Sequence, residues 1–267
     1  MEYLGSLGRL IPFRCASSER TGAGGRYVES FTVEGARRVQ AVPARPRVWE
    51  VSWGARDGGE LAKLESFVSG AWGHGPWHWV SVAAQVGNLL TPREALLLDR
   101  AGVSAASVQD AGPVRDSSGG WSPRSVTVTL DSGWVALVRG VPVHPDKPFT
   151  FSCDVEGAGT APHIHMAFYD AAGGLVQQFS QIGSGTAMQR VSRTVPVPAG
   201  AVSAHVGVRN TVARATRPQV TWTASAVPFS AGHGCRSAVV DGVSSDLLVV
   251  NSGGPVSGVG FTVLEVA

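Results

Sequence analysis

The chain has 267 residues, enough for one large domain or two medium ones with a sizeable hydrophobic core. Its 34 glycines, 16 prolines and 16% charged residues, with few long helical patterns, favour a mainly β protein with many turns. The formal net charge is only +2, and no apolar run approaches the roughly 20 residues that span a bilayer. We therefore expect neither nucleic acid nor a membrane among its partners.

The N-terminal region predicts a short strand followed by a loop. Residues 4–13 (LGSLGRLIPF) have a strand-like pattern, and Cys15–Gly25 is rich in Ser and Gly and predicts a mobile loop. An acidic residue at position 2 and the lack of a signal-type apolar core argue against export. Cys15, Cys153 and Cys235 are odd in number and far apart, so we expect free thiols, not a disulfide framework or zinc site.

A Trp-dense segment, residues 47–82, predicts strand, helix and strand. Trp49, Val51 and Trp53 alternate with polar residues, as in a half-buried strand. A capping-box-like start at Asp57, apolar residues at helical spacing and Gly70 as a stop predict the helix. Five of the eight tryptophans lie in this segment, which indicates the core of a domain. Before it, 27–33 and 38–42 predict two paired strands joined by a turn at 34–36.

From Asn88 onward the composition changes, and the pattern becomes that of a β-sandwich. Residues 93–98 predict a helical turn or an extended entry, and 110–123 (DAGPVRDSSGGWSP) predict a loop. About eight short strands then follow at the spacing of a jelly-roll sandwich: 125–130, 133–139, 149–155, 163–170, 175–179, 189–197, 203–210 and 219–225.

The last segment, 233–267, departs from this rhythm. It predicts strands at 235–243 and 246–250 around a turn at 242–245, and a closing strand at 260–266. We expect these strands to return to the Trp-dense sheet, because a terminal strand without a partner would expose an apolar edge. The sandwich would then be an insertion. The predicted domains are 1–87 with 233–267, a β domain with one helix, and 88–232, an inserted jelly-roll β-sandwich.

The sequence offers no convincing catalytic or metal-binding set. His74 and His78 lie in a Gly/Pro turn and a strand start, and His163 and His165 share one strand face, where histidines are usually not ligands. No Gly-x-Ser-x-Gly elbow is present, and the acids of the sandwich show no glycosidase-like pair. We predict a non-enzyme without cofactors. A structural calcium ion, bound by one of the acidic residues of the sandwich, stays an open alternative. The acidic residues considered are Asp131, Asp146, Asp154, Glu156 and Asp170.

Aromatic side chains near loops and strand ends of the sandwich are the remaining lead. An exposed ring there could stack on the apolar face of a sugar. Core positions are the favoured interpretation for Trp134 and Trp222, whereas Trp121, in the loop 117–123, is the better candidate for exposure. The candidate carbohydrate-binding residues are Trp121, Trp134 and Tyr169.

Two stretches carry a resemblance to known families. The phrases WEVSW, GAWGHGPWHWV and NLLTP, within 49–92, resemble the N-terminal region of minor tail proteins of actinobacterial phages, and through it the β domain of distal-tail proteins that form rings in siphophage baseplates. The phrases VPVHPDKPFTFSCDVEG, FYDAAG and QRVSRTVPVPAGAVSAHVGVR, within 141–209, are similar to jelly-roll carbohydrate-binding modules. Binding aromatics vary in position among such modules, so no family site residue is carried over.

The resemblance implies a structural component of a phage tail tip or baseplate. Such a protein would assemble in the host cytoplasm, reside in the virion tail, and form a homo-oligomeric ring that contacts tail tube and hub proteins. Its sandwich would face neighbouring tail proteins or host-surface glycan. Two other functions stay open. One is a soluble carbohydrate-binding protein, and the less favoured one is a hydrolase acting on cell-wall glycan.

Overall fold

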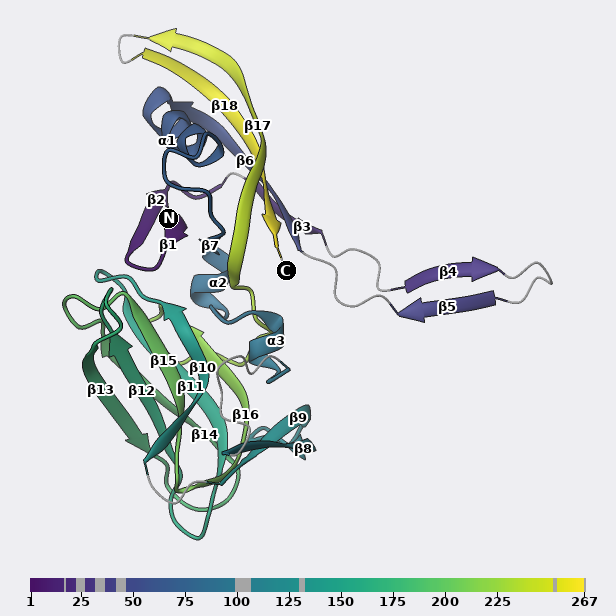
Figure 1. The fold of residues 1–267 in the computed structure, drawn as a ribbon, viewed down its shortest axis with the longest axis vertical. Helices are drawn as coiled ribbons and strands as arrows, with labels where there is room; N and C mark the ends of the chain where they lie inside the picture. The colour runs from purple at the N-terminus through teal and green to yellow at the C-terminus, as the bar shows by residue number, and fades with distance from the viewer. Residues whose placement is uncertain are drawn as a thin grey trace. The chain divides into compact units, whose positions relative to one another are not determined.

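The computed structural model describes residues 1–16, 18–22, 27–31, 37–41, 47–98, 107–129, 133–251 and 254–266. The protein is mainly β, with antiparallel sheets that include a β-sandwich, as the sequence predicts (Figure 1). The chain divides into two compact units. The first holds residues 1–2, 12–79 and 236–267, and the second holds 3–11 and 80–235.

The first unit contains one helix and a sheet built from distant parts of the chain. Its strands β7, β17, β18, β6 and β3 lie side by side in this order, and β4 pairs with β5 in a separate two-stranded sheet. The bounds are β3 Ser18–Gly22, β4 Tyr27–Phe31, β5 Arg37–Ala41, β6 Val48–Asp57, α1 Gly58–Val68, β7 Trp77–Val80, β17 Cys235–Asn251 and β18 Gly254–Glu265.

The closing strand pairs with the Trp-dense strand, as the sequence predicts. β18 runs antiparallel to β6, with Phe261 opposite Val51 and Val263 opposite Trp49. The ring of Phe261 lies edge-on to Trp53, with centroids 4.8 Å apart, and Trp53 stacks on Phe13 at 5.4 Å. These rings are almost fully buried, so the tryptophans and the last strand share one core.

The helix α1 follows the expected pattern. Leu64 and Phe67 face the core, and Phe67 contacts the rings of Trp72 and Trp77. Gly70 ends the helix with φ +78°, a left-handed conformation that glycine adopts without a Cβ clash. The predicted strand pair before it is also present as β4 and β5, while its turn at 34–36 lies outside the described residues.

The second unit is a β-sandwich of two facing sheets. One sheet has the order β10-β15-β12-β13 and the other β14-β11-β16-β9-β8, so that β10, β11 and β12 alternate between the sheets as in a jelly roll. The bounds are β1 Glu2–Ser6, β2 Arg9–Phe13, α2 Val82–Val86, α3 Pro92–Ala95, β8 Val108–Arg115, β9 Trp121–Val128, β10 Trp134–Pro142, β11 Pro148–Gly157, β12 His163–Tyr169, β13 Leu175–Ile182, β14 Gln189–Pro196, β15 Ser203–Arg209 and β16 Val212–Thr221.

The segment after β7 is fixed to the sandwich by one buried amide. Asn88 Oδ1 accepts hydrogen bonds from the backbone N–H groups of Leu90 and Val220, each at 3.1 Å. Its Nδ2 donates to the carbonyl of Ser230 at 3.2 Å. One side chain thus joins three segments of the second unit. Residues 80–87 and 3–11 also belong to this unit, whereas the predicted domain boundaries place them in the first.

Four local predictions are wrong. A strand, β3, occupies part of the predicted mobile loop 15–25, and β8 with the start of β9 occupies the predicted loop 110–123. The predicted strand 219–225 lies earlier, as β16. The predicted turn at 242–245 is a bulge inside one continuous strand, β17, in which pairing shifts between Asp241 and Ser244. Gly242, with φ +62°, supplies the bulge conformation.

Candidate functional surfaces

The three predicted aromatic candidates do not form one site. Trp134 and Tyr169 lie on β10 and β12 of the four-stranded sheet, with β15 between them, and Trp121 lies on β9 of the other sheet. Trp121 is 66% exposed, Trp134 and Tyr169 are partly buried, and Trp222 is a core residue at 6%. Trp134 is outside the core cluster, which differs from the favoured interpretation of the sequence.

The outward face of the four-stranded sheet carries two aromatic pairs. On β12, Ile164, Met166 and Phe168 point into the core, so the alternating residues His163, His165 and Tyr169 lie on the opposite face. Trp134 packs against His165 with centroids 4.4 Å apart, and Tyr169 packs against His205 of β15 at 4.2 Å. Such a face can stack on an apolar sugar surface through the partly exposed rings of Trp134 and Tyr169, whereas His165 is only 3% exposed.

The histidines of this face favour the neutral form. Burial lowers the pKa of His165 to about 4, with a smaller contribution from the charge of Arg209, while Gln178 opposes the shift. Burial and Arg209 also lower the pKa of His163. His165 Nδ1 lies 2.7 Å from the Ser180 hydroxyl. At neutral pH these rings are therefore uncharged hydrogen-bonding groups, not cations.

The described residues offer no metal site. No group of three or more His, Cys, Asp or Glu side chains among them is placed to hold an ion. His78 is buried beside Arg236, and burial, followed by that charge, lowers its pKa to about 4. Asp131, one of the acids considered for calcium, lies outside the described residues. The calcium ion stays a prediction.

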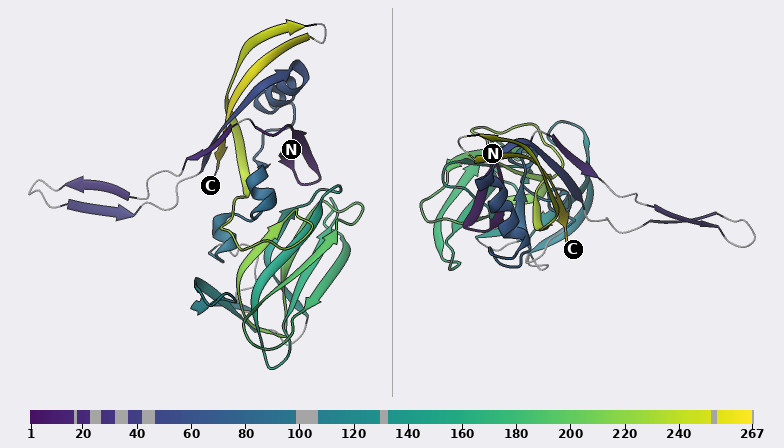
Figure 2. Two further views of the ribbon diagram at one scale, coloured as in Figure 1. Left: turned by 180° about the vertical axis from the view of Figure 1, so that it is seen from behind. Right: turned by 90° about the horizontal axis from the view of Figure 1, so that it is seen from above.

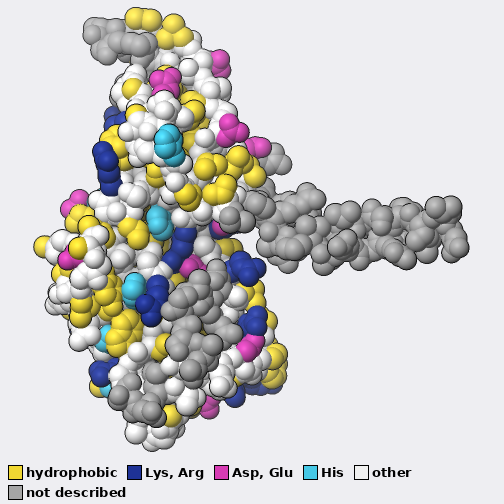
Figure 3. Space-filling model, viewed as in Figure 1, with side chains coloured by type: hydrophobic (Ala, Val, Ile, Leu, Met, Phe, Trp, Pro, Cys, Tyr) yellow, Lys and Arg dark blue, Asp and Glu magenta, His cyan; other side chains and the backbone are white. Residues whose placement is uncertain are grey.

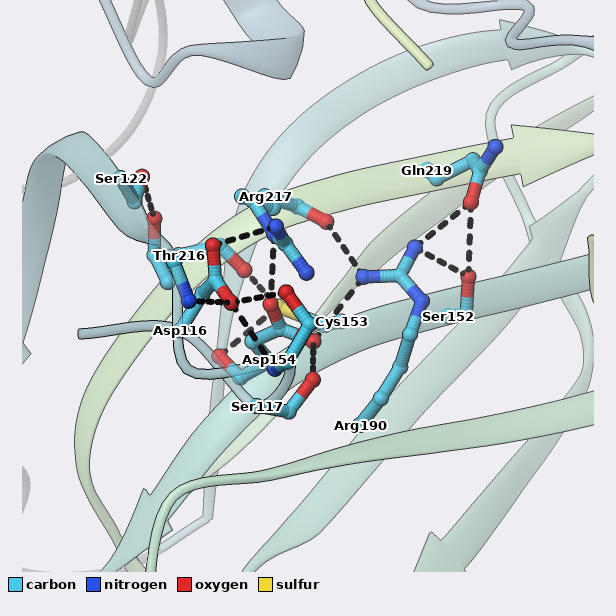
Figure 4. Close-up of polar contacts among 12 residues, drawn as sticks. Asp116, Ser117, Ser122, Ser152, Cys153, Asp154, Arg190, Thr216, Arg217 and Gln219 are labelled. Atoms are coloured by element: carbon cyan, nitrogen blue, oxygen red, sulfur yellow. Dashed lines mark hydrogen bonds and ion pairs between the residues drawn. The ribbon is translucent and has the colours of Figure 1, made fainter. Parts of the chain in front are cut away.

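Asp154, considered as a calcium ligand, instead accepts hydrogen bonds from two arginines. It is fully buried in β11, where Arg190 Nη1 donates to Oδ1 at 3.0 Å and Arg217 Nε donates to Oδ2 at 2.6 Å (Figure 4). Arg217 Nη1 also reaches Asp116 Oδ2 at 2.5 Å. The ring of Phe229 lies 5.6 Å from Arg190 and 5.0 Å from Arg217. We call Asp116, Asp154, Arg190 and Arg217 the ionic cluster.

A β-bulge brings Arg217 into the ionic cluster. Pairing between β11 and β16 shifts between Ser152 and Asp154, so Arg217 and Pro218 of β16 together oppose the single residue Cys153 of β11. Arg217 has φ +51°, a left-handed conformation that is strained for a side chain of this type. The bulge redirects the guanidinium so that it bridges Asp154 in the sheet and Asp116 in the β8–β9 turn. The ion pairs therefore hold the turn against β11 and β16.

The β8–β9 hairpin presents Trp121 at its turn. Arg115 is opposite Trp121 in the register, and its guanidinium lies 5.1 Å from the indole centroid. Val114 and Ser122, next to them in the chain, are buried, whereas Pro113, Arg115, Trp121 and Pro123 are exposed. By the alternation of strand side chains, these four exposed residues line one face. We call them the hairpin face.

A second exposed apolar region belongs to the first unit. Leu247, Leu248 and Val250, near the end of β17, are 64%, 58% and 67% exposed. They belong to the end of the yellow β17–β18 hairpin. This hairpin extends past α1 (Figure 2), and hydrophobic side chains are visible at this end of the unit (Figure 3). We call Leu247, Leu248 and Val250 the hairpin tip.

The sequence pattern did not point to Arg115, Asp116 or Arg217 as parts of these surfaces, whereas His205 was considered as a neighbour of His163 and His165. Arg115 and Asp116 had a usable signal, since DSSGG is a turn-forming run between two short segments, an arrangement typical of a hairpin. The bulge at Arg217 has one local signal, Pro218, because proline within a sheet is confined to edge strands, strand starts and bulges. Arg itself gives none, since it rarely adopts a left-handed backbone.

Comparison with known proteins identifies no family. No family model matches the chain, and no curated protein matches it. Solved structures with similar parts include the enzymatically active domain of tailspike protein 4 of bacteriophage CBA120, with 12% identity, a TM-score of 0.39, and coverage of 51% of this chain and 21% of the other. The arabinose-bound α-L-arabinofuranosidase MgGH51 has 13% identity, a TM-score of 0.33 and coverage of 53% and 27%.

A third solved structure contains the CBM22-1 and GH10 modules of Clostridium thermocellum xylanase 10B complexed with xylohexaose. It has 11% identity, a TM-score of 0.29, and coverage of 49% of this chain and 29% of the other. The chain thus spans less than a third of the length of these three proteins. No helix among the described residues has the length and apolar character needed to cross a membrane.

Proposed function

We propose that this chain is a structural component of a phage tail tip or baseplate. The first unit would form a homo-oligomeric ring, and the second would display its sandwich to neighbouring tail proteins or to host-surface glycan. The resemblance of residues 49–92 to minor tail and distal-tail proteins suggests this role. The observation that supports it most directly is the combination of the exposed hairpin tip with a long β17 that β7 covers only in part and with the outer edge of β3.

The first edge belongs to β17. This strand has 17 residues, whereas its neighbour β7 has four, so most of β17 has no partner on that side among the described residues. Unpaired backbone groups beside exposed Leu and Val side chains are a template for pairing with another chain. Such an edge is unfavourable in a monomer, because the apolar side chains stay in water.

The second edge belongs to β3, the last strand of the same row. β3 pairs with β6 on one side, and the described residues provide no strand on its other side. A contact between the β17 edge of one copy and the β3 edge of the next is heterologous, and repetition of such a contact closes a ring when the rotation between copies permits it. This geometry is what a ring-forming tail component requires.

The oligomeric state tests this proposal. We expect the purified chain to form one closed oligomer at micromolar concentration in light scattering and native mass spectrometry. The double substitution Leu247→Asp with Leu248→Asp places two charges in the interface and should weaken self-association by at least about tenfold. Leu175→Asp, at a 55% exposed position on β13 of the second unit, is the matched control and should leave the oligomer unchanged. A chain that stays monomeric at high concentration and in tail preparations would contradict the proposal.

The outward sheet face favours a second candidate function, that of a soluble carbohydrate-binding protein. Trp134 with His165 and Tyr169 with His205 place two aromatic pairs on one open sheet face. In this case Trp134→Ala and Tyr169→Ala should each weaken binding to a polysaccharide array, without changing the thermal unfolding midpoint by more than a few degrees. The absence of binding to every polysaccharide tested would exclude this function.

A further inference from the structure

We propose that the hairpin face is a binding site for an acidic saccharide, in which Trp121 stacks on the sugar ring and Arg115 pairs with its acid group. The site is distinct from the outward face of the four-stranded sheet and from the hairpin tip. It goes beyond the proposed tail function, because it requires no oligomer.

The first argument is the exposure of Trp121. Tryptophan is rarely exposed to this extent, since burial of its large apolar surface is favourable. Here the indole is 66% exposed, while Trp134 and Trp222 of the same unit are far less so. The Arg115 guanidinium lies over the ring, 5.1 Å from the indole centroid, and the exposed indole surface beside it is open to a flat apolar partner.

The second argument is that the turn bearing Trp121 is held rigid. Asp116 Oδ1 accepts hydrogen bonds from the backbone N–H groups of Ser118 at 2.8 Å and Gly120 at 3.2 Å. Asp116 Oδ2 accepts a hydrogen bond from Arg217, and the Ser117 hydroxyl donates a hydrogen bond to Asp154 at 2.9 Å. A preorganised ring loses little conformational entropy when a ligand stacks on it. The ionic cluster thus positions Trp121 without touching the ligand.

The third argument is the charge of the face. Arg115 Nη1 donates to the Gly119 carbonyl at 3.1 Å, and no carboxylate pairs with Arg115 among the described residues. Arg124 on the same hairpin does have a carboxylate partner, Asp110. The remaining guanidinium N–H groups of Arg115 are thus available to a carboxylate or phosphate, which they bind with bidentate geometry. The complementary ligand is anionic.

The size of the face favours a saccharide over a protein. One aromatic ring, two prolines and one arginine make a patch much smaller than the roughly 800 Å² that a protein buries in a stable interface. A single sugar ring with one acid group matches an indole face and an adjacent guanidinium. The anion can belong to a uronic acid or to a phosphate-substituted sugar. Both present a negative group beside a sugar ring, and binding to different probes distinguishes them.

The test is binding of the full chain to defined polysaccharides by affinity electrophoresis and calorimetry. The probes are polygalacturonate for the carboxylate, a phosphomannan for the phosphate, and dextran as the neutral comparison. We expect binding to at least one acidic probe, none to dextran, and weakening as ionic strength rises. Trp121→Ala and Arg115→Ala should each weaken binding to the acidic probe by about tenfold or more. Trp121→Phe, which keeps an aromatic ring, should lower the affinity for the acidic probe only a few-fold.

Matched controls separate local from general effects. Leu175→Ala removes another exposed apolar side chain, and Arg93→Ala removes another exposed positive charge, so both should bind like the wild type. Asp116→Asn should weaken binding while Trp121 and Arg115 remain, because it releases the turn from Arg217.

Three results would overturn the proposal. The first is that the chain binds neither acidic probe. The second is that Trp121→Ala binds the acidic probe as tightly as the wild type. The third is that the chain binds dextran as tightly as the acidic probe and that Arg115→Ala leaves this binding unchanged. Loss of a protein contact or of self-association in Trp121→Ala, without saccharide binding, would make the face a protein interface instead. A strictly monomeric chain that binds the acidic probe would contradict the tail function but support this site.

Discussion

Single residues decide the stability of the sandwich where charge is buried. Asp154 is fully buried and bonded to Arg190 and Arg217, so Asp154→Ala leaves Arg190 without its carboxylate and Arg217 with the Asp116 carboxylate alone. We expect a loss of about 3–5 kcal/mol in the free energy of unfolding. Asp110→Ala breaks a pair with Arg124 in which both side chains are about one-third exposed, and should cost about 1 kcal/mol or less. Urea unfolding measures both, and equal losses would show that burial does not set the difference.

A single histidine predicts the direction of a pH dependence. His165 has a pKa of about 4 in the fold, against 6.5 for the free side chain. Between these values the unfolded chain binds more protons than the folded chain, so the free energy of unfolding falls as pH falls. The loss begins near pH 6.5 and is complete below about pH 4. His165→Asn removes this group and should make the pH dependence less steep in urea titrations, while the contribution of His78, whose pKa is also lowered to about 4, remains. Parallel curves for variant and wild type would contradict the assignment.

At the level of elements, the last strand completes the first unit. Phe261 on β18 contacts Trp53 of β6 at 4.8 Å and Trp79 of β7 at 6.2 Å, and it is 4% exposed. Phe261→Ala removes a ring from between two tryptophans and should destabilise this unit by about 3–5 kcal/mol. Tryptophan fluorescence during urea unfolding reports the change, since five of the eight tryptophans lie here. Phe179→Ala on β13 of the second unit, where the ring is only partly buried, should cost less. A larger loss there would contradict the argument.

The same elements show what the sequence could and could not predict. Trp49, Val51 and Trp53 alternate strictly, and Gly70 stops an apolar helix stripe, so β6 and α1 are readable from their periods. Bulges break that period. Gly242 lies inside β17, although a glycine at this point of the sequence predicts a turn. Gly112 and Pro113 interrupt the strand pattern of β8, and the pairing of β8 shifts on both sides of Gly112. The contact of Trp134 with His165 depends on cross-strand register, which follows from no local pattern. The ionic cluster joins residues up to 101 positions apart and requires the bulge at Arg217.

At the level of the whole molecule, the chain order implies separable roles. The sandwich is inserted between β7 and β17, and these strands are neighbours in one sheet of the first unit. A polypeptide can leave the sheet at β7 and re-enter at β17 over a short distance, so the intervening residues 80–235 contribute little to the pairing of β17, β18, β6 and β3. Assembly through the β17 and β3 edges should therefore not require the sandwich.

Excision of the sandwich tests this separation. We expect a chain in which a short Gly/Ser linker replaces residues 80–235 to keep its strand signal in circular dichroism and to form an oligomer with the same number of copies as the full chain. Leu247→Asp with Leu248→Asp in the excised chain should again weaken the oligomer, because the hairpin tip is retained. A folded but monomeric excised chain would place the assembly contacts on the sandwich. An unfolded one would show that the first unit depends on the second, and the two roles would then not be separable.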